Sequence, residues 1–472
     1  MDNHLEDKIY SVSRSRISGK VSSISGLNMS VLGLSGFVDV GSRCNVAAKH
    51  GAIPAEVIAI GHEHVTLLPF GTWDGVSVGD TVEIVEFADL ITPDETWLGK
   101  VVDALGQPLD TSAFAPRPRR TGASSGTAPI KALARRRVGG KLETKIAGLD
   151  IFVPLCQGQR VGVFAGSGVG KSTLMAMLAR NTNADVVVIG LVGERGREVQ
   201  EFIDEDLGPE GLKKSVIVVA TGDEAPLLRK HAALTATRIA ERFRQDGKHV
   251  LLLIDSITRF AMAQREIGLT RGEPLANRGY PATVFSELPR LLERSGPGRT
   301  NEGDITAVYT VLVDGDDMNE PVSDAARGIL DGHIVLDRKV AESGRYPAID
   351  LLSSISRMLP GCHSPEEYEI TLAARKALGR YQDMEDLIRV GAYRPGSDPE
   401  VDAAVRFHAT ATALLTQRKD NPINADEAFA QIYRLMLEAG IDDPLSKLFD
   451  AAPPPDGLER NAGHLEHGDR LS

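Results

Sequence analysis

A glycine-rich segment that runs into lysine and two hydroxyl residues carries the strongest chemical signal in this sequence. It reads Ala165-Gly166-Ser167-Gly168-Val169-Gly170-Lys171-Ser172-Thr173. Glycines let backbone N–H groups converge on phosphate oxygens, because no Cβ obstructs the approach, and a helix that begins there adds partial positive charge. We therefore expect residues 166–173 to bind the phosphates of a nucleoside triphosphate, with the Lys171 ammonium on the β- and γ-phosphates and the Ser172 hydroxyl on Mg²⁺.

An acidic residue suited to activating water follows this segment. Glu194 closes a predicted apolar strand 23 positions after Lys171, where a carboxylate can polarise a water in line with the γ-phosphate. We expect Arg195 to bind γ-phosphate oxygens and Glu198 to hold a metal-bound water. The alternative is a charged loop at a helix start, where acidic residues also stabilise the helix dipole.

A second acidic residue ends another apolar run, Val250-Leu251-Leu252-Leu253-Ile254-Asp255. A buried strand that ends in Asp255 presents its carboxylate to hydrated Mg²⁺ beside Ser172. The pattern is common alone but specific when it follows a phosphate-binding segment. In the sequence, the strand of Glu194 lies between the phosphate-binding segment and Asp255. This order suggests that it is a central strand inserted between the other two, which is the arrangement of water-activating ATPases rather than of typical GTPases.

Alternating strands and helices must position these groups. Between residues 150 and 355, apolar strands alternate with helices, and such alternation predicts an α/β fold with a mainly parallel sheet covered on both faces. The predicted strands cover residues 159–165, 185–192, 215–221, 249–255 and 305–313, and the predicted helices 172–180 and 226–244.

Segments of a different character flank this core. Short strands separated by glycine turns predict a small β-barrel over 19–92. The core domain is expected over 93–363. Helix starts at Ser364 (a capping box with Glu367), Asp398 and Asn424 predict a helical C-terminal domain over 364–450. Residues 1–18 are expected to form a short helix that binds a partner, or to be disordered, and 451–472 are expected to be a disordered tail.

Composition excludes several classes of protein. The 472 residues carry a net charge of −12 with only 5% aromatic residues, which argues against general nucleic-acid binding. No apolar run approaches the roughly 20 residues that span a bilayer, and no secretory signal is visible. The three cysteines, Cys44, Cys156 and Cys362, have no metal-ligand spacing and indicate reduced thiols in a cytoplasm.

Several segments resemble a known family. Gly193-Glu194-Arg195-Gly196-Arg197-Glu198, Asp255-Ser256-Ile257-Thr258-Arg259-Phe260 and the stretch from Pro347 to Arg357 resemble the rotary ATP synthase α/β superfamily. Residues 315–321 and 327–333 resemble its type III export branch, and the flagellum-specific members match best. The resemblance covers roughly residues 19–440 and implies that the α/β core is a RecA-like P-loop ATPase core.

The resemblance, rather than composition or spacing, implies how the sites assemble. It implies a homohexameric ring with ATP and Mg²⁺ at each subunit interface. Arg357 is then an arginine finger that enters the neighbour's site, with a structural ion pair as the alternative. Arg259 is expected to contact the γ-phosphate within its own subunit. The acidic loop over 314–320 is expected to face the pore and touch a central stalk-like protein, in preference to binding calcium.

The same resemblance implies an ATP phosphohydrolase that energises the delivery or unfolding of flagellar export substrates. Its expected partners are a regulator at the N-terminus, the stalk-like protein, export substrates and chaperones, and no nucleic acid. The expected location is the cytoplasm, with peripheral association at the inner-membrane export gate. Three alternatives stay open: the ATPase of a virulence-type secretion system, a hexameric RNA translocase, and a non-catalytic ring subunit.

Overall fold

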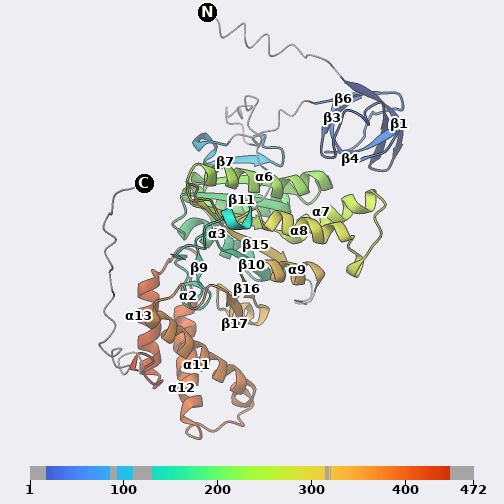
Figure 1. The fold of residues 1–472 in the computed structure, drawn as a ribbon. Helices are drawn as coiled ribbons and strands as arrows, with labels where there is room; N and C mark the ends of the chain where they lie inside the picture. Colours follow the sequence, from blue (N-terminus) through green and yellow to red (C-terminus); the bar gives the residue numbers. More distant parts are fainter. Residues whose placement is uncertain (1–16, 86–92, 110–129, 314–317, 319, 447–472) are drawn as a thin grey trace, which may run out of the picture.

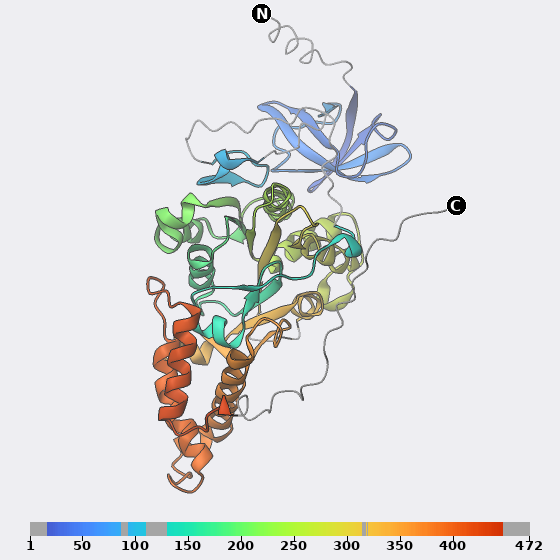
Figure 2. The same cartoon turned by 60° about the vertical axis from the view of Figure 1, so that its left-hand side comes forward.

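A computed structural model describes residues 17–85, 93–109, 130–313, 318 and 320–446 (Figure 1). The expectations for residues 1–16, for the tail over 451–472 and for most of the acidic loop over 314–320 lie outside these residues. Along the long axis of the molecule, a β-barrel, a sheet flanked by helices and a bundle of long helices follow one another (Figures 1 and 2).

The N-terminal domain is a closed antiparallel barrel, as predicted. Its strands close in the order β1-β2-β5-β4-β3-β6. Alternate side chains point inward, and Met29, Val31, Cys44 and Val46 are fully buried in its core, the alternation expected of a pleated strand. The strands are β1 (Ser18–Ser25), β2 (Asn28–Leu32), β3 (Arg43–Ala48), β4 (Gly51–Ile60), β5 (His64–Pro69) and β6 (Thr81–Ile84).

The central domain is built on a nine-stranded sheet with the order β17-β16-β10-β15-β13-β11-β12-β7, and β14 pairs with β15 beside this path. All pairings are parallel except those of β14 and of the edge strand β17. The strands are β7 (Lys100–Asp103), β10 (Arg160–Ala165), β11 (Val186–Glu194), β12 (Ser215–Thr221), β13 (Val250–Asp255), β14 (Gly296–Pro297), β15 (Asp304–Leu312), β16 (Gly332–Leu336) and β17 (Ile349–Ser356).

The sheet order corrects one expectation. The strand inserted between β10, which leads into the glycine-rich turn, and β13, which ends in Asp255, is β15. The strand of Glu194, β11, lies on the far side of β13. Strand order in a parallel sheet depends on which crossovers pack together over long range, so the order along the chain does not fix it.

Helices cover both faces of the sheet, as predicted. Alternate residues of β11 enter different cores: Val187 and Ile189 enter one, and Val186 and Val188 the other. On the face of Val187 and Ile189 lies α3 (Lys171–Asn181), and on the opposite face lie α6 (Pro226–Gln245), α7 (Ile257–Thr270) and α8 (Ala282–Leu292). Shorter helices are α2 (Ala147–Phe152), α4 (Gly196–Glu201), α5 (Gly208–Lys213), α9 (Pro321–Ile329) and α10 (Arg338–Glu342).

The C-terminal domain contains α11 (Pro365–Arg389), α12 (Pro399–Leu415) and α13 (Ala425–Glu438). Ser364 and Glu367 form the predicted capping box, and the Asp398 side chain caps α12. Asn424 precedes α13 as expected, but its side chain makes no capping hydrogen bond. Phe407 and Ile432 join the core on the α3 face of the sheet, so this domain packs directly on the central one.

A small apolar cluster joins the barrel to the central domain. Phe70, directly after β5, packs with Leu227 of α6 and Ile267 of α7. Beside it, His231 of α6 and Glu56 of β4 form a buried pair with Nε2 and Oε2 2.6 Å apart. Among the residues that the model describes, we find no helix with the length and apolar character needed to cross a bilayer.

Candidate active site

The glycine-rich turn joins β10 to α3 at the carboxyl edge of the sheet. Gly168 and Gly170 take positive φ angles of 80° and 90°, a conformation that L-residues with a side chain rarely adopt. No side chain caps the N-terminus of α3. The turn therefore presents backbone N–H groups and the positive end of a helix at one point, which is the arrangement that binds phosphate.

Three residues predicted from separate motifs meet beside this turn. The Lys171 ammonium lies 2.5 Å from Asp255 Oδ1 and 3.1 Å from Glu194 Oε1. Parallel strands β11 and β13 are hydrogen-bonded neighbours, with Leu191 opposite Asp255, so both carboxylates leave the sheet at the same edge. The arrangement places the Lys171 ammonium between two acidic residues that lie 23 and 84 positions after it in the sequence.

Burial and charge shift the protonation of this cluster. Burial alone would lower the pKa of Lys171, but Asp255 and Glu194 outweigh it and the pKa is raised. Burial, and then the charge of Asp255, raise the pKa of Glu194 to about 7, although Lys171 acts in the opposite direction. A carboxylate that titrates near neutrality can accept a proton from water and release it again.

The remaining charged residues of this segment lie at its solvent side. Arg195 Nη1 is 3.0 Å from Glu198 Oε1, and the Arg195 side chain is 86% exposed. A hydrogen bond between Glu198 and Glu194 contributes to the raised pKa of Glu194. Glu198 therefore adjoins the buried cluster, while Arg195 faces solvent.

Arg259 lies against the strand tip that carries Glu194. A Cβ on Gly193 would lie only 2.9 Å from the Arg259 Cβ, so glycine at 193 permits the close approach of α7. The Arg259 Nε is buried without a hydrogen-bond partner, and Nη1 reaches only the Met262 sulfur, at 3.7 Å. A partly buried guanidinium whose buried Nε–H is unused, next to the cluster, is suited to an anionic ligand.

Arg357 lies far from this cluster within its own chain. Residue 356 ends the edge strand β17 and pairs with Gly332, at the start of β16, whereas the glycine-rich turn follows the end of β10. Five strand-to-strand steps separate β17 from β11, which corresponds to about 24 Å. The exposed guanidinium donates one hydrogen bond, to the Arg327 carbonyl oxygen at 3.3 Å. The structure therefore does not bring Arg357 to the site of its own subunit.

Two residues near the site were not predicted from the sequence. Thr310 of β15 donates its hydroxyl to Asp255 Oδ1 at 2.7 Å. The Tyr346 ring lies 3.4 Å from the position of a Cβ on Gly170 and is 43% exposed. An aromatic residue directly before Pro347, in a segment already singled out, was an available signal for Tyr346, whereas a threonine within a strand gives none.

The donor set fits Mg²⁺ that is bound together with a nucleotide. Among the described residues no group of three or more acidic, histidine or cysteine side chains forms a metal site. Ser172 and Asp255 offer one hydroxyl and one carboxylate, and Mg²⁺ in nucleotide sites typically takes one or two protein oxygens plus phosphate oxygens and waters.

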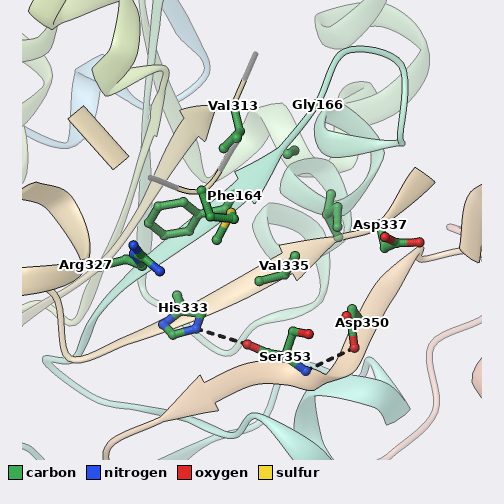
Figure 3. Close-up of a pocket in the computed structure, with 12 residues that line it drawn as sticks. Phe164, Gly166, Val313, Arg327, His333, Val335, Asp337, Asp350 and Ser353 are labelled. Carbon is green, nitrogen blue, oxygen red and sulfur yellow. Dashed lines mark hydrogen bonds between the residues drawn. The ribbon is translucent and has the colours of Figure 1, made fainter. Parts of the chain in front are cut away.

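A separate cavity of about 320 Å³ opens on the β10–β16–β17 side of the turn (Figure 3). It touches Gly166 and is lined by both charged and apolar side chains. His333 Nε2 hydrogen-bonds to the Ser353 carbonyl oxygen, and the Ser353 N–H donates to Asp350 (Figure 3). These three residues thus bond to one another, and no residue of the Lys171 cluster lines the cavity.

Comparison with known proteins agrees with this geometry. Residues 145–356 match the ATP synthase alpha/beta family, nucleotide-binding domain, and residues 363–434 match the T3SS EscN ATPase C-terminal domain. The "Flagellum-specific ATP synthase" of Caulobacter vibrioides is 47% identical, over 89% of this chain and 96% of the relative. The "Type 3 secretion system ATPase" of Pseudomonas syringae pv. tomato is 44% identical, over 89% and 94%.

Solved structures give the same assignment. The structure of the assembled ATPase EscN from the enteropathogenic E. coli type III secretion system superposes with a TM-score of 0.81 and 37% identity. The match covers 89% of this chain and 100% of that one. EscN in complex with its central stalk EscO gives a TM-score of 0.79. This chain therefore belongs to the ATP synthase α/β family of ATP-hydrolysing enzymes, in the group formed by the flagellum-specific and type III secretion ATPases.

Proposed function

We propose that this protein is the Mg-ATP-hydrolysing ATPase of a flagellar type III export apparatus. The observation that carries the proposal is the meeting of Lys171, Glu194 and Asp255 beside a phosphate-binding turn, in a chain 42–49% identical to proteins named flagellum-specific ATP synthase. An intact acid–lysine–acid cluster argues against a non-catalytic ring subunit.

Each member of the cluster has a distinct proposed role. Residues 166–173 bind the triphosphate through backbone N–H groups, and the Lys171 ammonium exchanges its carboxylate partners for phosphate oxygens. Ser172 and Asp255 hold Mg²⁺, which supplies charge neutralisation at the phosphates, and Glu198 orients a water of its shell. Freed from Lys171, Glu194 accepts the proton of the attacking water.

The arginines act around the γ-phosphate. Arg259, with its buried and unused Nε–H, binds γ-phosphate oxygens within the subunit, and Arg195 closes over them from the solvent side. Arg357 serves the site of a neighbouring subunit, because its own site lies across the sheet. This division requires a ring, and we propose a homohexamer in which each interface holds one ATP. The assembled form of EscN supports this arrangement.

The partners follow from the same family. The complex of EscN with its central stalk EscO supports a stalk-like protein as the axial partner, met by the loop over 314–320. We further propose an export regulator at residues 1–18, with export substrates and chaperones as clients. The protein works in the cytoplasm, at the periphery of the inner-membrane export gate.

Three measurements test the proposal: ATPase activity against protein concentration, deletion of the gene, and the effect of RNA on turnover. ATP hydrolysis by the purified chain, measured against protein concentration, should rise cooperatively because interface sites form only in the ring. Deletion of the gene should abolish flagellar filaments, and the wild-type copy should restore them. Loss of secreted virulence proteins with normal filaments would assign the chain to a virulence-type system instead. Strong stimulation by RNA would favour a translocase.

The raised pKa of Glu194 predicts the pH dependence of turnover. A base must be deprotonated, and Glu194 loses its proton at about pH 7 in the free enzyme, so kcat/KM for ATP should rise from pH 6 to pH 8. Glu194→Gln should lower turnover by about 10²–10⁴ and remove this acidic limb. A wild-type profile that is flat from pH 6 to 8 would contradict the role of Glu194.

Tyr346 is proposed to stack on the adenine ring. Its exposed ring stands beside Gly170, and base–aromatic stacking contributes about 1–3 kcal/mol. Tyr346→Ala should therefore raise KM for ATP about tenfold with little change in kcat. Tyr346→Phe keeps the ring and should behave as wild type. Equal KM values in the alanine variant and the wild type would exclude this contact.

A further inference from the structure

Two of the three cysteines, 206 positions apart in the sequence, meet in the fold. Cys156 ends the short strand β9 (Leu155–Cys156), and Cys362 lies in the turn between β17 and α11. The two thiols lie close enough for each to shift the pKa of the other. Cys44 lies in the core of the barrel, in a different domain.

Hydrogen bonds that do not involve the cysteines hold the segment before Cys156 against the segment before α11. The Ser356 hydroxyl donates to the Pro154 carbonyl oxygen at 2.8 Å. His363 Nε2 donates to the Ile151 carbonyl oxygen at 3.0 Å. The segment 356–363 therefore runs beside 151–154. Lys141 of β8 (Lys141–Leu142) pairs with Cys156 across the strands and forms an ion pair with Glu367 at 2.9 Å, which brings Cys156 to the segment that carries Cys362.

The two thiols differ in exposure and acidity. Cys156 is buried, whereas Cys362 is partly exposed. The hydrogen bond from Cys156 lowers the pKa of Cys362, and the nearby charge of Lys141 acts in the same direction. The same hydrogen bond, and then burial, raise the pKa of Cys156. The partly exposed cysteine is thus the one that more readily becomes a thiolate, the reactive form.

We propose that Cys362 and Cys156 form a redox-active pair, which a hydroperoxide oxidises to an intramolecular disulfide. The Cys362 thiolate attacks the peroxide, the O–O bond breaks, and Cys362 becomes a sulfenic acid while one water leaves. The Cys156 sulfur then attacks the Cys362 sulfur, its proton joins the departing hydroxide, and a second water leaves. Two thiols and one H₂O₂ give one disulfide and two waters.

The bridge joins β9 of the central domain to the chain that leads from β17 into α11. Disulfides in cytoplasmic proteins are usually transient and redox-sensing, and this pair has the partly exposed attacking thiol and the adjacent resolving thiol that such a role requires. The site stands apart from the Lys171 cluster, so the inference rests on the proposed function only for the cytoplasmic location.

The test uses the full-length reduced protein and hydrogen peroxide as the probe. Titration of thiols after denaturation should fall from three to one, with the intact mass lower by two hydrogens and full reversal by dithiothreitol. Peptide mapping should find the peptides of Cys156 and Cys362 joined. Three unmodified thiols, a bridge that includes Cys44, or a bridge between two chains would overturn the proposal.

Variants separate the two roles. Cys44→Ser, the control, should still form the bridge and fall from two thiols to none. Cys156→Ser should stop at the sulfenic acid on Cys362, which dimedone traps. Cys362→Ser changes the partly exposed residue and should leave Cys156 unreactive. Oxidation of Cys156 in this last variant, at the wild-type rate, would show that Cys362 is not the attacking thiol.

Discussion

Lys171→Ala is expected to lower ATP turnover by at least about 10³-fold, close to complete loss. The ammonium is the one cation between Glu194 and Asp255 in the described structure, and it is the proposed neutraliser of the transferred phosphate. Removing one preorganised donor to developing charge typically costs about 10²–10³ in rate, and loss of ATP affinity adds to it. Turnover and binding of a fluorescent ATP analogue measure the two effects.

The control must separate chemistry from folding, because Lys171→Ala also leaves two buried carboxylates facing each other. Loss of one partner of a buried ion pair costs about 3–5 kcal/mol, so the melting temperature should fall. Ser172→Ala removes a hydroxyl from an exposed side chain and leaves the cluster paired, so its stability should be unchanged while turnover collapses. Lys213→Ala, at an exposed lysine paired with Glu210, should retain full turnover.

Wild-type turnover in Lys171→Ala would remove the phosphate-binding role from residues 166–173. Full stability together with lost turnover would have a different meaning. It would show that the two carboxyl groups share a proton when the ammonium is absent. The pH of maximal stability should then be lower than in the wild type, because a proton held only in the folded state makes stability fall as the pH rises.

The elements that carry the chemistry were predictable because their signals are local. Glycines followed by Lys171 specify a turn between strand and helix, and apolar runs that end in Glu194 and Asp255 specify strand tips. In a parallel sheet such tips share one edge, so residues far apart in sequence were expected near one phosphate. The α/β fold with a barrel and a helical domain was confirmed on this basis.

Other features depend on contacts that no short segment encodes. The position of β15 between β10 and β13 depends on which crossover packs where. Thr310 bonds Asp255 only because of that position. The contact between Cys156 and Cys362 likewise arises from the path of the chain between domains. The roles assigned to the site residues stay predictions, and the experiments above test them.

A second large loss of turnover is expected from Arg357, which we propose to act on the site of a neighbouring subunit. Arg357→Ala should leave ATP binding near normal and lower turnover by about 10³–10⁵, the usual contribution of an arginine supplied to the γ-phosphate from a neighbour. Its guanidinium is exposed and donates a hydrogen bond to the Arg327 carbonyl oxygen, so removing it opens no cavity. Arg418→Ala, at an exposed arginine of the C-terminal domain, is the matched control and should keep wild-type turnover.

Mixing two inactive variants decides whether the arginine acts between subunits. In equal mixtures of Arg357→Ala and Glu194→Gln subunits, half of the sites retain Glu194, and half of those face a subunit that retains Arg357. In a ring with head-to-tail interfaces, about a quarter of the sites are therefore complete, and turnover should recover to about that fraction of the wild-type rate. Recovery cannot occur if both residues serve the same subunit, because no subunit in the mixture carries both. A mixture as inactive as its components would place Arg357 in a structural role.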